Sequence, residues 1–360
     1  MRNVKGIVCL SVCASLMLMT SACSSSSDAK PAGSSQFTGQ SLNVFDWPEY
    51  IPDDVIHDFE DEYGVTVNAS TFDTNEEMLA KVQSSAAGTY DIVCPSDFMV
   101  QYMISEGMLA ELDMDKIANF SNLNESYLNQ SYDPGNKYSI PLGTGIIIPA
   151  YNKSEIPEGA ITSLDDLFSP DLKGKVCALD DMRIMVGLTS MSMGYSLSET
   201  DPEVLSKINE KFMTLKDNIY SMSIAGPEGP LVSGDVPAAY IYNGSIALAM
   251  MDNEDIVPVW PEEGSYIWID NMCITADSTK KDLANAFINY ILDAEVDAKM
   301  RNEMPCTDPN KAGWELVDES IRDIEALNIP DEQIKKGQYP ITLDTDTLNI
   351  YSQMWTEFTK

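Results

Sequence analysis

Hydrophobic and polar positions along the first third of the chain follow two periods in turn. Residues 53–63 place Val55, Ile56, Phe59 and Tyr63 on one stripe, which predicts an amphipathic helix. The shorter apolar runs on either side of it lack that period and are typical of buried strands. The resulting assignment is strands at 42–46, 65–67 and 90–94, and helices at 53–63, from Thr74, and at 97–108. This β-α-β-α-β order predicts a parallel sheet with helices on both faces.

The same alternation restarts after Tyr151-Asn152. Ser163-Leu164-Asp165-Asp166 is a capping box, and the chain from Thr279 onward is mostly helical. The predicted elements are strands at 176–179, 238–242 and 265–269, and helices at 181–193, 201–218, after Asn243-Gly244-Ser245, and at 345–358. The chain is therefore of the α/β class, and its length favours two lobes over a single core.

The first 40 residues form no part of this pattern. Residues 1–22 have a basic start and a short apolar run, which indicates a secretory signal peptide, and Cys23 stands where a lipoprotein is acylated. A plain signal peptide with an incidental cysteine is the alternative. The apolar run is too short for a membrane-spanning helix. Residues 23–40 are rich in Ser, Gly and Ala, which predicts a flexible tether.

The charge narrows the range of partners. The formal charge is −35, and removal of Arg2 and Lys5 with the leader changes it to −37. Nucleic acid is excluded as a partner because phosphates need basic surface. An acidic body attracts cations, although acidity that only keeps an exported protein soluble is an equal alternative.

Histidine and cysteine usage argues against several kinds of chemistry. His57 is the only histidine, which removes Ser-His-Asp and Cys-His catalysis and most zinc sites. Cys94, Cys177, Cys273 and Cys306 remain after the leader and Cys23, and none forms a Cys-x-x-Cys pair. We expect no metal and no cofactor, and the pairing of these cysteines stays open.

Aromatic and acidic residues gather at the predicted strand ends, where open parallel sheets bind their ligands. Aromatic faces attract cations, and carboxylates complete an ammonium site. These positions predict a pocket for a small organic cation. Each residue also has a structural alternative, such as core packing for the tryptophans, helix capping for Ser96 and Asp181, and a solvated loop for Glu49. The candidates are Trp47, Glu49, Tyr50, Ser96, Asp97, Asp181, Tyr242, Trp268 and Asp270.

Several motifs in order along the chain resemble the bacterial polyamine (spermidine/putrescine) substrate-binding proteins of ABC transporters. They are Trp47-Pro48-Glu49-Tyr50-Ile51-Pro52, Tyr90-Asp91-Ile92-Val93-Cys94-Pro95-Ser96, Asn119-Phe120-Ser121-Asn122-Leu123, Tyr138-Ser139-Ile140-Pro141, Asp180-Asp181-Met182-Arg183, Tyr242-Asn243-Gly244-Ser245 and Trp268-Ile269-Asp270. The resemblance implies a two-lobed type II periplasmic-binding-protein fold with crossover hinge strands. It places lobe 1 at 41–144 plus 271–317, and lobe 2 at 145–270 plus 318–360.

The resemblance also implies roles for the candidate residues. Trp47, Tyr50, Tyr242 and Trp268 would form aromatic walls, Asp181 and Asp270 would bind ammonium groups, and Glu49 and Ser96 would add polar contacts. A protein of this family is expected to be a monomer without enzymatic activity. It would deliver putrescine, spermidine or a related amine to a permease driven by an ATPase, and a lipid on Cys23 would hold it outside the cytoplasm on the cell membrane.

The chain departs from the family pattern at four places. Ile184 stands where spermidine binders carry a second acid, and Phe98 replaces a tyrosine. Leu142-Gly143-Thr144 lacks an aromatic pair, and the segment near Tyr339-Pro340 lacks a clear polar contact. These losses favour a shorter diamine or another organic cation, with Asp97 as a substitute for the missing acid.

Two other functions stay open. One is an extracytoplasmic hydrolase, such as a glycosidase, that uses paired carboxylates in a water-accessible cleft. The other is a structural or signalling relative that kept the fold and lost transport.

Overall fold

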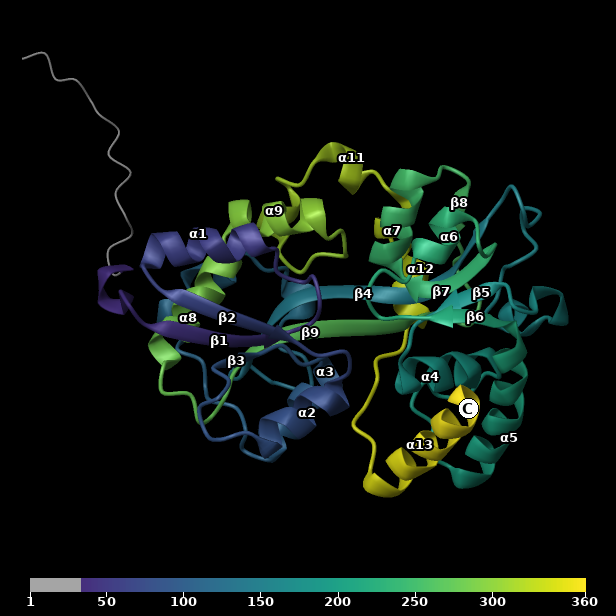
Figure 1. Cartoon of the computed structure of the whole chain (residues 1–360), viewed down its shortest axis with the longest axis horizontal. Helices are drawn as coiled ribbons and strands as arrows, with labels where there is room; N and C mark the ends of the chain where they lie inside the picture. The colour runs from purple at the N-terminus through teal and green to yellow at the C-terminus, as the bar shows by residue number, and fades with distance from the viewer. Residues whose placement is uncertain (1–33) are drawn as a thin grey trace, which may run out of the picture.

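The structure is a computed structural model that describes residues 34–360 (Figure 1). The expected leader, Cys23 and most of the expected tether lie outside the described residues. The last residues of the expected tether are folded: a 3-10 helix, η1 (Ser34–Phe37), ends in a buried aromatic side chain. Phe37 lies in the core, with its ring centroid 6.3 Å from that of Tyr63. Within the described residues, Phe37 of the expected tether thus packs against the first lobe.

One nine-stranded sheet runs through the whole molecule. The strand order is β2-β1-β3-β9-β4-β7-β5-β6, and β8 pairs with β4. The β1–β2, β1–β3, β5–β6 and β5–β7 ladders are parallel, and every ladder that involves β4 or β9 is antiparallel. The strands are β1 (Ser41–Asp46), β2 (Thr66–Thr71), β3 (Ile92–Val93), β4 (Ser139–Asn152), β5 (Val176–Ala178), β6 (Ile219–Met222), β7 (Ala238–Tyr242), β8 (Ile256–Pro258) and β9 (Tyr266–Ile274).

Helices cover both faces of the sheet at each end, and this gives two lobes (Figure 1). In the first lobe α1 and α8 lie on one side of β1–β3, and α2 and α3 lie on the other. In the second lobe α4, α5 and α13 pack together on one side, and α6 and α7 lie on the other. The helices are α1 (Asp53–Tyr63), α2 (Asn75–Ser84), α3 (Asp97–Ser105), α4 (Met182–Ser192), α5 (Pro202–Leu215), α6 (Gly229–Ser233), α7 (Asn243–Asp252), α8 (Lys281–Ile291), α9 (Ala294–Glu303), α10 (Lys311–Trp314), α11 (Glu319–Arg322), α12 (Asp331–Lys336) and α13 (Thr345–Thr359).

Strands β4 and β9 join the two lobes. They pair with Gly143 opposite Asp270 and Gly145 opposite Trp268, after a register shift between Pro141 and Gly143. The sequence pattern did not identify β4, because all of its residues are buried and a fully buried strand shows no alternation of apolar and polar positions. The pattern also predicted that the later strand ends at Ile269, five residues before the end of β9, because the last residues of β9 are likewise all buried.

Three hydrophobic clusters form the core. Two belong to the first lobe, one around Phe59 and Phe287 under α1 and α8, the other around Met78 and Met99 under α2 and α3. The third fills the second lobe and includes Phe212 from α5. The alternating pattern of the sequence thus predicts the helices well: α1 has the expected bounds, and Thr74 caps α2 by accepting a hydrogen bond from the Glu77 N–H.

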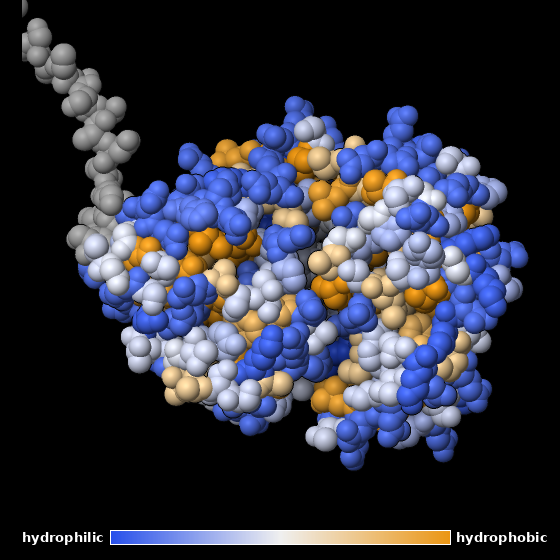
Figure 2. All heavy atoms as spheres, in the orientation of Figure 1, coloured by the Kyte–Doolittle hydropathy of each residue, from blue (hydrophilic) through white to orange (hydrophobic). Residues whose placement is uncertain are grey.

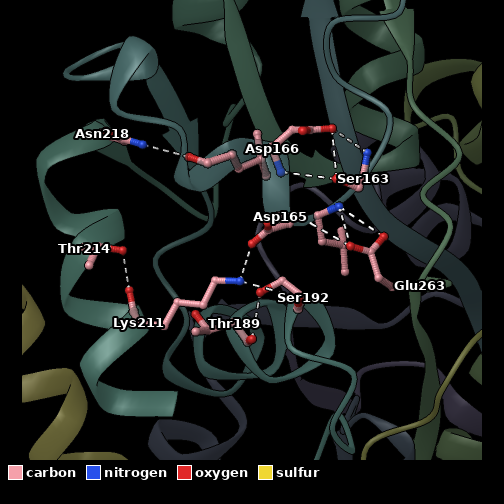
Figure 3. Close-up of polar contacts among 11 residues, drawn as sticks. Ser163, Asp165, Asp166, Thr189, Ser192, Lys211, Thr214, Asn218 and Glu263 are labelled. Carbon is pink, nitrogen blue, oxygen red and sulfur yellow. Dashed lines mark hydrogen bonds and ion pairs between the residues drawn. The ribbon is translucent and has the colours of Figure 1, made fainter. Parts of the chain in front are cut away.

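The predicted capping box lies in the second lobe and organises a turn (Figure 3). Asp166 accepts hydrogen bonds from the Ser163 hydroxyl and backbone N–H at 2.9 and 3.0 Å. The Ser163 hydroxyl accepts in turn from the Asp166 N–H at 3.3 Å, and the element that follows is a short 3-10 helix, η5 (Asp165–Phe168), and not an α-helix. Lys211 of α5 pairs with Asp165 and reaches the Ser192 carbonyl, so this turn is tied to the helices beside it.

The single histidine and the four cysteines that follow Cys23 differ in their exposure to solvent. His57 is an exposed residue of α1. Cys94, Cys177, Cys273 and Cys306 are all buried and free. Within residues 34–360 no helix combines the length and apolar character needed to cross a bilayer. The same residues contain no group of three or more His, Cys, Asp or Glu side chains arranged to hold a metal ion.

Candidate functional site

A cavity of about 140 Å³ lies between the two lobes and contains almost all of the predicted site residues. Figure 2 shows the furrow that separates the lobes on one face of the molecule. The predicted residues that line the cavity are Trp47, Glu49, Tyr50, Ser96, Asp181, Tyr242, Trp268 and Asp270. Asn75, Arg183, Glu228 and Tyr266 also line it, together with apolar residues that include Phe98 and Ile184.

The loop after β1 supplies one aromatic wall. Trp47 packs against Phe72 with ring centroids 4.5 Å apart, and its indole N–H is buried without a hydrogen-bond partner in the described structure. Glu49 has a φ of 61°, in the left-handed region that non-glycine residues rarely adopt. Such backbone strain is typical of functional loops. The loop therefore holds a costly conformation that brings two aromatic rings and a carboxylate to the cavity.

A chain of hydrogen bonds holds Asp270 of β9 in place. It is buried, and Oδ1 accepts a 2.6 Å hydrogen bond from the Ser96 hydroxyl. Asn75 holds Ser96 in turn through bonds to its hydroxyl and backbone N–H, so Ser96 orients Asp270 and makes no capping bond to α3. Burial raises the pKa of Asp270 to about 7, although the Ser96 bond and the nearby Tyr50 hydroxyl lower it.

The second aromatic wall comes from Tyr242 and Trp268. Their rings are 5.8 Å apart at 77°, an edge-to-face arrangement, and the Trp268 indole N–H is also buried and unpaired among the described residues. Two glycines of β4 make room for the walls. A Cβ at Gly143 would lie 2.1 Å from the Tyr50 hydroxyl, and one at Gly145 would lie 2.8 Å from the Trp268 ring. A side chain at Gly143 would therefore collide with Tyr50.

Asp181 has the capping role that the sequence left open, and it also lines the cavity. Its Oδ1 accepts a 2.9 Å bond from the Ile184 N–H at the start of α4, which leaves Oδ2 free of that bond. Burial raises the pKa of Asp181, and the nearby Arg183 lowers it. Ile184 itself is buried and presents an aliphatic surface to the cavity.

Arg183 connects the two lobes at the cavity wall. Its guanidinium carbon lies 3.9 Å from the centroid of the Phe98 ring, and Nη1 lies 3.9 Å from Glu76 Oε1 on α2. Nη2 donates to the Ile341 carbonyl. Phe98, which replaces a tyrosine, therefore serves as a surface for a cation of the protein itself.

Asp97 does not line the cavity. Its Oδ1 accepts from the Phe98 N–H at 2.7 Å, its Oδ2 is buried without a described partner, and burial raises its pKa well above the ordinary value. Asp97 is thus a buried acid that lies outside the cavity lining. Sequence reasoning missed Asn75, Arg183 and Glu228, because two lie within helices and one lies in a loop without a strand end beside it. The sequence could have indicated Tyr266, since it alternates with Trp268 and Asp270 along one strand and therefore shares a face with them.

The charges of the cavity favour a cation. Four acids line it, and among the described residues Arg183 is the only lysine or arginine that does so. The aromatic rings complete a slot in which a positively charged group would be enclosed.

Comparisons with known proteins agree with this geometry. Residues 54–311 match the model of the bacterial extracellular solute-binding protein family. The spermidine/putrescine-binding periplasmic protein of Escherichia coli K12 is 33% identical over 298 residues, which covers 83% of this chain and 86% of that protein.

Two solved structures extend the comparison. The spermidine/putrescine ABC transporter substrate-binding protein PotD of Streptococcus pneumoniae superposes with a TM-score of 0.74 at 32% identity, covering 89% of this chain and 99% of that one. The Tp0655 (TpPotD) lipoprotein of Treponema pallidum gives a TM-score of 0.78 at 25% identity, covering 88% and 99%.

Proposed function

The chain belongs to the bacterial extracellular solute-binding protein family, and from this membership and the geometry of the cavity we propose that it captures a polyamine between its lobes for an ABC transporter. The observation that carries the proposal is Asp270. A carboxyl buried between aromatic walls, with no ion-pair partner in the described structure, provides a site for an ammonium group.

The cavity favours a short, slender ligand. Its volume is below the roughly 300–1,000 Å³ of pockets that hold drug-sized ligands. Ile184 offers no partner for a third ammonium group, and an unpaired buried charge is costly. Putrescine is therefore expected to bind at least as tightly as spermidine.

The proposal includes the setting in which the protein works. Relatives that carry the name periplasmic protein or lipoprotein support an extracytoplasmic location and an anchor on Cys23. We infer that the lobes divide within the facing stretches of β4 and β9, that the monomer presents bound ligand to a permease, and that no reaction occurs in the cavity. A carboxylate-based hydrolase is disfavoured, because burial leaves Asp270 and Asp181 enclosed by aromatic rings and not beside open solvent.

A thermal-shift screen over polyamines, amino acids and sugars tests this function. A ligand that binds only the folded state stabilises it by about 4 kcal/mol at a thousandfold excess over the dissociation constant, which raises the melting temperature by roughly 5–10 °C. We expect putrescine to give such a shift. A shift with sugars or neutral amino acids, and with no amine, would show that the ligand class is wrong.

A further inference from the structure

Glu228 is an acid of the cavity wall to which the sequence pattern assigned no role. It lies at the end of the loop between β6 and α6, and it lines the same cavity as Asp270. Its Oε2 is buried and has no hydrogen-bond partner in the described part of the chain. The Ser245 hydroxyl at the start of α7 is close enough to bond the carboxylate and lower its pKa. One carboxylate oxygen of Glu228 is therefore buried away from water and accepts no hydrogen bond in the described structure.

Glu49, an acid of the other lobe, lines the same cavity as Glu228. Burial is the main reason why the pKa of Glu228 is raised, and the negative charge of Glu49 raises it further. Glu49 is the residue held at a φ of 61°, in the left-handed region that non-glycine residues rarely adopt. The loop of lobe 1 thus brings an exposed carboxylate to the cavity that the partly buried carboxylate of lobe 2 also lines.

No basic side chain compensates this pair within the described structure. Arg183 lines the cavity, but its guanidinium is engaged by Phe98, Glu76 and the Ile341 carbonyl. Two carboxylates that line one cavity disfavour each other's charged form. A cation placed between them would remove this repulsion and would provide the missing hydrogen-bond donor for Glu228.

We propose that Glu228 and Glu49 together bind the second ammonium group of the ligand, while Asp270 binds the first. This inference rests on the proposed function and specifies its ligand as a linear amine with at least two ammonium groups. Because Glu49 and Glu228 come from different lobes, the second ammonium group holds the lobes together, and a monoamine cannot do so.

The position of Glu228 differs from that of the acid that Ile184 replaces. Asp181, which stands three residues before Ile184, caps α4, whereas Glu228 directly precedes α6. The second acid is thus supplied from the loop before α6 and not from α4. It also replaces Asp97, which lies behind the wall.

The test is isothermal titration of the mature protein with putrescine and with 1-aminobutane, a monoamine of the same length. Glu228→Gln should weaken putrescine binding about 10- to 100-fold, in line with a charge-assisted hydrogen bond of about 1.5–3 kcal/mol, and should leave 1-aminobutane binding within about twofold. Asp252→Asn is the matched control, because Asp252 adds to the same local negative charge but does not line the cavity. It should change putrescine affinity by less than about twofold.

Further variants separate a ligand contact from a structural role. Glu228→Asp keeps the charge and withdraws it by one methylene, so its putrescine affinity should lie between those of the wild type and Glu228→Gln. The loss in the Glu49→Gln/Glu228→Gln double variant should be smaller than the sum of the single losses, because both acids act on one ammonium group.

Each negative result of these titrations has a distinct meaning. If Glu228→Gln binds putrescine like the wild type while Asp270→Asn does not bind it, then Glu228 is not a ligand group and the polyamine function stands. If Glu228→Gln weakens both amines equally, its role is structural and the inference is overturned. If the wild type binds neither putrescine nor spermidine, this inference and the proposed function both fall.

Discussion

At the scale of single residues, the cavity is defined by acids that burial has made weak. Asp270 and the neighbouring Asp46 both have a pKa raised to about 7, and in both cases burial is the main cause. Asp46 gives one oxygen to the Trp47 N–H and keeps the other buried and unpaired in the described structure. Of the two, Asp270 lines the cavity, so a bound ammonium group would displace the proton that Asp270 holds near neutral pH.

Ligand affinity should consequently depend on pH. Below pH 7 Asp270 is protonated in the free protein, and binding of an ammonium group must release that proton, so putrescine affinity should fall about tenfold per pH unit between pH 7 and 5.5. Putrescine keeps both charges over this range, because alkyl amines titrate near pH 10. Titration calorimetry in buffers of different ionisation enthalpy measures both affinity and proton release.

The stability of the ligand-free protein should change in the opposite direction. Between about pH 4 and 7 the folded state holds protons on Asp270 and Asp46 that the unfolded chain has already lost, so the free energy of unfolding should decrease as pH rises through this window. Asp270→Asn should flatten that dependence. Affinity that is constant from pH 5.5 to 8 would mean that Asp270 does not bind the ligand.

At the scale of elements, α9 holds the floor of the cavity in place through Arg301. This buried side chain donates to the Leu142 carbonyl of β4 and to Cys306 Sγ, both at 2.9 Å. Its Nε lies 3.5 Å from Asp297 and 3.8 Å from Asp308. Burial raises the pKa of both carboxyls, and the guanidinium lowers it. One arginine thus joins a helix, a crossover strand and a loop that lines the cavity.

Arg301→Met should lower the free energy of unfolding by about 3–5 kcal/mol, because it leaves two buried acids and a carbonyl without their cation. Denaturant unfolding measures this loss. Lys299→Met is the matched control on the same helix: Lys299 pairs with Asp54 and Asp58 at the surface, so its loss should cost less than about 1 kcal/mol. Equal effects of the two substitutions would rule out a special role for Arg301.

At the scale of the whole molecule, contacts between the lobes surround the cavity. Arg183 of lobe 2 reaches Phe98 and Glu76 of lobe 1. The segment between α12 and α13 crosses the front of the molecule between the lobes (Figure 1), and Thr342 in it donates to the Phe98 carbonyl at 2.9 Å. Closure of the two lobes is therefore supported by the protein itself and not only by a ligand.

Glu76→Gln should speed dissociation of bound putrescine by roughly two- to tenfold, because it removes the acid that holds Arg183 across the lobes while leaving every cavity-lining residue unchanged. Stopped-flow displacement measures this rate. Glu77→Gln, the adjacent change, removes an ion pair with Lys81 within α2, keeps an acceptor for the Asp73 N–H, and should leave the rate unchanged. An unchanged rate in Glu76→Gln would show that Arg183 does not latch the lobes.

The sequence by itself determined the elements with a clear period and the chemistry of the cavity. The stripe of α1, the cap of α2 and the acids and aromatics after β1 and β5 are readable because periodicity and capping are local properties. Strand β4 was not predicted because complete burial removes alternation, and Glu228 was not predicted because only the fold brings it to the cavity that Glu49 lines. The tertiary structure also decided that Ser96 orients Asp270 and that Asp97 lies behind the wall. Such pairings join residues far apart in the chain, and desolvation and close approach exist only once the lobes are packed.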